Sequence, residues 1–376
     1  MAASAQTSPL KASQIGKSPA QRLQCVDALR GFDMFWILGG DYVVRSFVAI
    51  HDSPLTRWLA GEMEHSEWAG FHFYDFIFPL FIFIVGVSLV FSLSGMLERV
   101  GRAATLKRIF RRSIILFLLG VFHMGGVANG FDGMCFAGVL QRIAGAYFFA
   151  ALIFCFFRPR QMVWICAALL AGYWALLTFV PVPGMAAPTL AAPGKNLAHF
   201  IDEQYLPGQR FEGTILSTMT AVANCLLGVF AGLLLRNDRV KGREKVMWLA
   251  AGGGVSLLLG LVWSLEFPII KLLWTSSYVL VAGGCSALLL ALFYQLIEQW
   301  NFRSWAQPFV WIGLNALPIY VIAGIVNFHR LTERFAGGDV RNILGHWSGL
   351  ATAVLSLALA LWLARFFYRQ NIFLRL

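Results

Sequence analysis

Charged residues are scarce in this sequence. Asp, Glu, Lys and Arg make up 13% of its 376 residues, whereas 58% are apolar, and the mean hydropathy is +0.68. A soluble globular protein has about a quarter charged residues. This composition excludes a typical water-soluble enzyme, and it also excludes collagen-like and disordered chains.

Several functional motifs are missing as well. The six cysteines form no CxxC pair and mostly lie inside apolar runs, which excludes a disulfide framework and a metal site of Cys and His at the usual spacing. No P-loop, GxSxG or HExxH sequence occurs. The chain is therefore no ATP-hydrolysing pump by itself, and we expect no metal cofactor.

Long apolar segments fill most of the chain. Each is long enough for a helix that crosses a bilayer, which takes about 20 residues. The sequence thus predicts an all-α polytopic membrane protein with about ten transmembrane helices, in a single domain over 22–376 that follows a disordered cytoplasmic tail at 1–21. The predicted spans are 27–49, 72–96, 107–125, 135–157, 161–181, 214–235, 246–264, 275–297, 308–328 and 346–368.

The basic residues predict the orientation of these spans. The two tails and alternate turns hold 20 Lys and Arg, the opposite set of connections holds 8, and two lie within spans. Because cytoplasmic loops are enriched in Lys and Arg, both termini should face the cytoplasm. The net charge of +11 is then explained by topology, so we expect the lipid bilayer as a partner and no nucleic acid.

The first predicted span carries four ionisable residues. In a continuous helix at about 100° per residue, Asp27, Arg30, Asp33 and Asp41 fall within one third of the circumference, so this face should point into the bundle. Asp27 and Arg30 stand three residues apart and favour a structural ion pair. Asp41 lies near the outer surface without a cation in its helix, which favours a functional role.

A second polar group opens the next span. By the predicted topology, His65, Asp75 and Asp41 all lie at the outer side of the membrane. A neutral imidazole beside a carboxylate is a competent general base near neutral pH. A histidine in a loop is more often simply solvated, and the other six histidines lack such neighbours.

Further polar residues lie deeper in the chain. Arg142, in the fourth span, needs a carboxylate, a helix C-terminus or an anionic ligand as a partner. Lys271, Trp274 and Asn315 are each compatible with ordinary helix packing. The basic turn at 107–112 is a topological signal that would also suit the phosphates of an anionic ligand.

Several short motifs together resemble one known family. They are VDALRG at 26–31, GDY at 40–42, HSEWAG at 65–70, DFIFPLFIFIVGVS at 75–88, GVLQR at 138–142, EGTIL at 212–216, LWTSSYV at 273–279 and GLNA at 313–316. The sequence is similar to the transmembrane acetyltransferases typified by heparan-α-glucosaminide N-acetyltransferase. It resembles most closely their bacterial NagX-type members, which are linked to N-acetylglucosamine use.

The resemblance implies a reaction. An acetyl group would pass from cytoplasmic acetyl-CoA to the amine of glucosamine or a related amino sugar on the periplasmic side of a bacterial inner membrane. His65 falls at the catalytic histidine and Asp75 at a matching acidic position, whereas Asp41 stands where the lysosomal enzyme has Asn. The candidate contacts to acetyl-CoA are Arg142, Gln141, Lys271, Trp274, Ser277, Asn315 and Arg30. Of these, Arg142 and Lys271 are candidates for contact with the CoA phosphates on charge grounds, as is the basic turn at 107–112.

Two mechanisms and two other functions stay open at this stage. His65 could deprotonate the acceptor amine, with a backbone amide or Asn315 as oxyanion donor, or it could itself be acetylated first. The chain could instead be an amino-sugar transporter that uses its buried carboxylates as a proton relay, or an accessory membrane subunit. The resemblance is also compatible with a homodimer.

Overall fold

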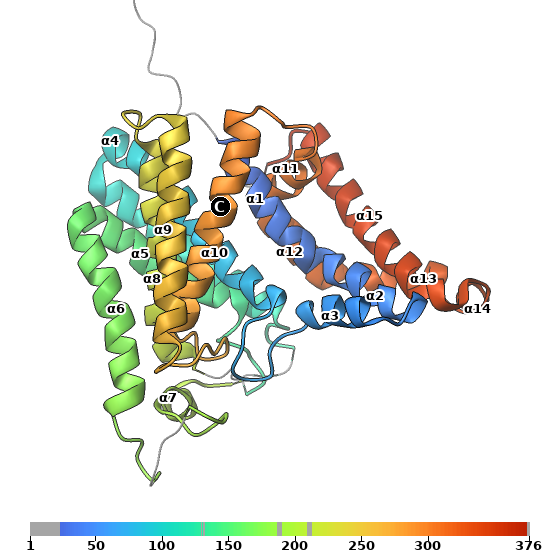
Figure 1. Cartoon of the computed structure of the whole chain (residues 1–376), viewed down its shortest axis with the longest axis horizontal. Helices are drawn as coiled ribbons and strands as arrows, with labels where there is room; N and C mark the ends of the chain where they lie inside the picture. The colour runs from blue at the N-terminus through green and yellow to red at the C-terminus, as the bar shows by residue number, and fades with distance from the viewer. Residues whose placement is uncertain (1–22, 129, 131, 186–189, 209–212, 374–376) are drawn as a thin grey trace, which may run out of the picture.

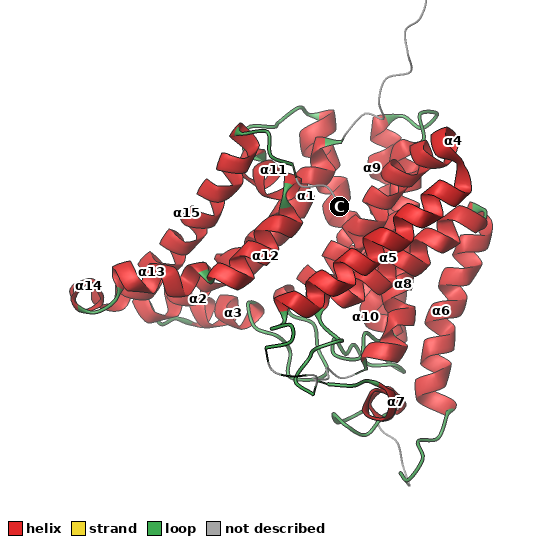
Figure 2. Ribbon diagram, turned by 180° about the vertical axis from the view of Figure 1, so that it is seen from behind, coloured by secondary structure: helices red, strands yellow, loops and turns green. Residues whose placement is uncertain are grey.

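The protein is described by a computed structural model, which places residues 23–373 except 129, 131, 186–189 and 209–212. Within these residues the fold is all-helical without a named strand, and an isolated β-bridge joins Ala69 to Ile270 (Figures 1 and 2). The N-terminal half forms α1 (Gln24–Phe35), a π-helical turn (Trp36–Gly40), α2 (Asp41–Ile50), α3 (Pro54–Glu62), α4 (Phe73–His123), α5 (Val139–Phe156) and α6 (Pro159–Phe179). The remainder forms α7 (Leu197–Tyr205), α8 (Thr214–Arg236), α9 (Gly242–Trp263), α10 (Ser276–Tyr294), a π-helical turn (Gln295–Gln299), α11 (Gln307–Leu314), α12 (Ala316–Val326), α13 (Phe328–Ala336), α14 (Asp339–Leu344), a short 3₁₀ turn (Gly345–Trp347) and α15 (Ser348–Arg369).

Several of these helices are suited to a bilayer. Seven are long and apolar enough to cross a membrane, and an eighth crossing is formed if α11 and α12, which meet at 81°, count as one broken span. The prediction of a polytopic helical membrane protein is confirmed in this coarser form. The number of ten spans stays a prediction.

Two glycines explain why the number of candidate spans differs from the predicted ten. Gly39, with a φ of 127°, interrupts the first predicted span, so that α1 and α2 are each too short to cross. Gly101, with a φ of 76°, interrupts the 51 residues of α4. Phe78 near the start of α4 and Met124 just after its end line the same cavity, so the two parts of α4 run in opposite directions.

The connections between helices gather at two ends of the bundle. The turns from α8 to α9 and from α10 to α11 lie at the top of Figure 1, whereas α7 and its loops lie at the bottom and α3 lies at the lower edge of the right half. The Lys and Arg count predicts that these two sets lie on opposite sides of the membrane. Their separation in space agrees with this alternation, and the side that each end faces stays a prediction.

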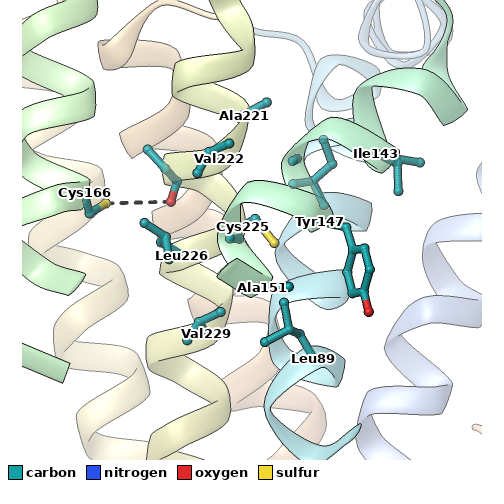
Figure 3. Packing of buried hydrophobic residues seen from close by; sticks show 14 of the residues in the cluster. Leu89, Ile143, Tyr147, Ala151, Cys166, Ala221, Val222, Cys225, Leu226 and Val229 are labelled. Atoms are coloured by element: carbon teal, nitrogen blue, oxygen red, sulfur yellow. Dashed lines mark hydrogen bonds between the residues drawn. The ribbon is translucent and has the colours of Figure 1, made fainter. Parts of the chain in front are cut away.

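Close helix packing holds the central helices together. A Cβ atom on Gly86 of α4 would lie 2.0 Å from the carbonyl oxygen of Cys225 in α8, and one on Gly228 would lie 2.0 Å from that of Phe83. Small residues of this kind let helix backbones approach each other in membranes. Figure 3 shows the adjoining core, where Leu89, Tyr147 and Cys225 pack together.

Candidate active site

A cavity of about 370 Å³ opens among α1, α4, α5, α12 and the loop before α10. This volume is within the range of about 300–1,000 Å³ found for small-molecule sites. Most of its lining is apolar, and its polar side chains are few. The residues that can form polar or charged contacts there are His65, Tyr74, Arg142, Lys271, Trp274 and Tyr320.

The carboxylate of Asp75 lies beside this cavity and is held by several hydrogen bonds. Its side chain is fully buried in the first turn of α4, where its Oδ2 accepts hydrogen bonds from the backbone N–H of Ser66 at 3.2 Å and of His72 at 3.1 Å. The hydroxyl of Ser66 donates to the same oxygen at 2.9 Å. Because the N-terminus of a helix also favours negative charge, this site stabilises a carboxylate.

His65 is held by that carboxylate. Its Nδ1 lies 3.0 Å from Oδ1 of Asp75, its ring lies 5.0 Å from the ring of Tyr74, and its side chain is 53% exposed. A proton on Nδ1 that is donated to Asp75 leaves the lone pair on Nε2, which is the arrangement of a general base oriented by a carboxylate. The predicted pairing of His65 with Asp75 is therefore present in the structure.

Lys271 completes the group from a distant part of the chain. Its Nζ lies 3.2 Å from Oδ1 of Asp75, 2.7 Å from Nδ1 of His65 and 3.1 Å from Nε2 of the same ring. The backbone N–H of Gly70 donates to the carbonyl of Ile269 at 2.9 Å, which fixes the lysine loop against the histidine loop. Burial lowers the pKa of Lys271, and the nearby Asp75 opposes this shift.

Arg142 and Trp274 form the deeper part of the lining. The guanidinium of Arg142 lies 5.1 Å from the ring centroid of Trp274, which is a cation–π contact, and both residues are buried. Within the described part of the chain, no carboxylate lies within ion-pair distance of Arg142. The guanidinium thus packs on an aromatic ring and lines the cavity, and the predicted carboxylate, helix C-terminus or anionic ligand stays a prediction.

Three of the predicted acetyl-CoA contacts lie elsewhere. Gln141 donates to the carbonyl of Cys135 at 2.9 Å, and the hydroxyl of Ser277 donates to the carbonyl of Pro268 at 3.2 Å. Asn315, at the bend between α11 and α12, donates to the carbonyl of Ile372 at 3.0 Å. The cavity lining does not include these three side chains.

Arg30 and Asp41 are also separate from the cavity lining. Arg30 forms an ion pair with Asp27 at 3.4 Å and donates a hydrogen bond to the hydroxyl of Ser88 at 2.6 Å. It is not among the residues that line the cavity. This is the structural ion pair that the spacing favours. Asp41 is buried at the start of α2. Among the described residues its Oδ1 has no hydrogen-bond partner, and its side chain forms no ion pair with His65.

Two members of the site were not found from the sequence. Ser66 binds Asp75 twice, and the hydroxyl of Tyr278 donates to the backbone carbonyl of Asp75 at 2.7 Å. The position of Ser66 directly after His65 was a usable signal, because short hydroxyl side chains often bind nearby carboxylates. Tyr278 lies in the motif LWTSSYV at 273–279, but that motif does not signal a contact with Asp75. No cluster of three or more metal-binding side chains occurs in the ranges that the structure describes.

Two curated proteins are similar to this chain. Heparan-alpha-glucosaminide N-acetyltransferase of Mus musculus is 26% identical over 368 residues, which covers 81% of this chain and 54% of that protein. The Homo sapiens protein of the same name is 24% identical over 417 residues, which covers 94% of this chain and 59% of that protein. No family model matches the chain. The resemblance predicted from the motifs is confirmed, the chain spans little more than half of these relatives, and the NagX link stays a prediction.

Proposed function

We propose that this protein is a transmembrane acetyltransferase that moves an acetyl group from acetyl-CoA to the amine of glucosamine or a related amino sugar. The observation that carries this proposal is the pair of His65 and Asp75 at the mouth of an apolar cavity, with Nδ1 to Oδ1 at 3.0 Å. The names of the two similar proteins supply the substrate class.

The site suits each part of this reaction. Nε2 of His65 would take a proton from the acceptor amine as it attacks the thioester carbon, and Asp75 would hold the imidazole in the required tautomer. The apolar lining would take the pantetheine arm and acetyl group of acetyl-CoA, which are mostly uncharged. The alternative, in which His65 is acetylated first, uses the same nitrogen.

The proposed location is the inner membrane of a bacterium, with His65 on the periplasmic side and acetyl-CoA supplied from the cytoplasm. The Lys and Arg count supports this orientation. The domain proposed to act is 22–376, and the homodimer compatible with the resemblance is part of the same proposal.

Purified protein in detergent tests the function directly. With acetyl-CoA and glucosamine we expect N-acetylglucosamine and CoA in equal amounts, and we expect His65→Ala to abolish both products. His51→Ala is the matched control, because His51 is exposed and does not line the cavity. A wild-type protein that forms no acetylated sugar, or a His65→Ala variant with full activity, contradicts the proposal.

One observation favours transport as a second candidate. Asp33 is fully buried in α1, and neither of its carboxylate oxygens has a hydrogen-bond partner among the described residues. Buried carboxylates in membrane helices often carry protons. Uptake of labelled glucosamine into sealed vesicles without acetyl-CoA, lost in Asp33→Asn, would support transport, whereas the acetyltransferase predicts no such uptake.

A further inference from the structure

Apart from two tyrosines, Tyr74 and Tyr320, the ionisable groups that line the cavity beside Asp75 are basic. Lys271 and Arg142 are cationic, His65 is an imidazole, and no Asp or Glu side chain belongs to the lining within the described residues. Asp75 lies behind this surface, where His65, Lys271 and backbone N–H groups already bind it. The cavity therefore favours a ligand atom that carries or develops negative charge.

Lys271 is the cation closest to the proposed base. Its Nζ lies 3.1 Å from Nε2 of His65, the atom proposed to receive the proton of the amine. Any ligand atom that accepts a hydrogen bond from this ammonium must lie next to the reacting atoms. The side chain is only 15% exposed, so its charge acts where water screens it little.

We infer that Lys271 is a catalytic residue that donates a hydrogen bond to the carbonyl oxygen of the acetyl thioester. This inference rests on the proposed function and gives Lys271 a different role from the predicted contact with CoA phosphates. The lysine would stabilise the negative charge that appears on this oxygen as the tetrahedral intermediate forms.

The step can be written with its electrons and protons balanced. The amine nitrogen attacks the carbonyl carbon, the new C–N bond forms, and the π electrons of the carbonyl move to its oxygen, which Lys271 binds. Nε2 of His65 takes one proton from the nitrogen. The C–S bond then breaks as the carbonyl re-forms, and the leaving CoA thiolate takes that proton from His65.

Other predicted donors are engaged elsewhere. The side-chain amide of Asn315 donates to the carbonyl of Ile372, and the cavity lining does not include it. Arg142 lines the cavity but stacks on Trp274 at 5.1 Å, and within the described residues it forms no hydrogen bond with His65. Lys271 is the donor that the structure places against the base.

The first test compares two substitutions of Lys271 by steady-state kinetics. We expect Lys271→Met to lower kcat by about 10²- to 10³-fold with a small change in KM for acetyl-CoA, as for loss of an oxyanion donor. Lys271→Arg should retain more of kcat, because it keeps the charge. Lys195→Met is the matched control: Lys195 is exposed and lies outside the cavity lining, and we expect this variant to have wild-type kcat.

A second test reads the contact itself. Dithioacetyl-CoA replaces the carbonyl oxygen by sulfur, which accepts hydrogen bonds weakly, so the wild-type protein should react much more slowly with it than with acetyl-CoA. If Lys271 binds this atom, the ratio of the two rates should fall several-fold in Lys271→Met. A lysine that only supports the fold would lower both rates equally and leave the ratio unchanged.

The outcomes separate this inference from the proposed function. A wild-type protein without acetyl transfer contradicts the proposed function. Acetyl transfer that depends on His65 but survives in Lys271→Met, or an unchanged thioester-to-dithioester ratio in that variant, overturns the role of Lys271 alone. Thermal unfolding of each variant in detergent checks that the loss of rate is not a loss of fold.

Discussion

His65 and Asp75 differ sharply in their solvent exposure although their side chains are hydrogen-bonded to each other. The imidazole is 53% exposed, whereas the carboxylate 3.0 Å away is fully buried. Here a buried carboxylate orients an imidazole at the edge of a cavity. This arrangement is expected when a general base must meet a substrate from solution.

Asp75→Asn should therefore lower kcat while leaving the fold largely intact. The amide has nearly the same shape but no charge, so it would stabilise the imidazolium of His65 poorly and allow the wrong tautomer. We expect a fall in kcat of about 10²- to 10⁴-fold, measured by CoA release.

Asp52→Asn is the control for this substitution. Asp52 is an exposed carboxylate in the connection between α2 and α3 and pairs with Arg57 at 2.5 Å. We expect Asp52→Asn to keep wild-type activity. Activity in Asp75→Asn equal to that of the control would show that the buried carboxylate does not orient the base.

The helical framework was largely predictable, because each membrane helix is a local run of apolar residues. The first span was not predictable in the same way. A continuous helix from Asp27 to Asp41 is predicted, but the backbone leaves the helical region at Gly39, where φ is 127°. The predicted meeting of Asp41 with His65 rested on the topology, which puts both residues at the outer side, and it stays a prediction. A glycine can leave the helical region at little cost, and the sequence does not say where it does so.

The candidate site was predictable only in part for a similar reason. His65 and Asp75 are ten residues apart, and their motif is local. Lys271 is 206 residues from His65, so its charge alone gave a different expectation, a contact with CoA phosphates. Tertiary packing decides this contact, and no helical period or spacing signals it.

The pH dependence of the reaction should report on Lys271. Burial lowers the pKa of this lysine from its ordinary value of 10.5, so it loses its proton at a lower pH than a solvated lysine would. Since the charged form is the proposed donor, kcat should fall as the pH rises through that pKa. In Lys271→Arg the guanidinium stays charged, so this alkaline fall should be absent.

The measurement is kcat against pH for both proteins at saturating acetyl-CoA and acceptor. Deprotonation of the acceptor amine affects the wild type and the variant equally, so the difference between the two profiles isolates position 271. An alkaline fall of the same size in both profiles would rule out Lys271 as its source.

Filling the cavity should weaken binding of the acetyl donor. Leu317 of α12 lines the cavity, and Leu317→Trp would place a bulky indole ring in the space proposed for the pantetheine arm. We expect KM for acetyl-CoA to rise at least about tenfold, which corresponds to about 1.4 kcal/mol. Leu317→Ala enlarges the cavity and is the control, for which a much smaller increase in KM is expected.

Surface labelling tests the predicted orientation. Lys195→Cys places a single exposed thiol just before α7, and Arg239→Cys places one in the turn between α8 and α9. Helix α7 and that turn lie at opposite ends of Figure 1. The six natural cysteines are buried or partly buried, so they should give little background. In intact cells, a membrane-impermeant maleimide should label position 195 and leave position 239 unlabelled, and the reverse pattern would put His65 on the cytoplasmic side.

Two glycines on different helices should respond in opposite ways to alanine. In Gly86→Ala the new Cβ would lie 2.0 Å from the carbonyl oxygen of Cys225, so α4 and α8 must separate, and overpacking of this kind costs about 1–3 kcal/mol. A Cβ on Gly254 of α9 would meet no atom within 4 Å, and alanine there gains up to about 1 kcal/mol of helix propensity. Thermal unfolding in detergent should show a lower Tm for Gly86→Ala and an unchanged or higher Tm for Gly254→Ala. Equal Tm values for the two variants would mean that α4 and α8 do not depend on close backbone contact at this point.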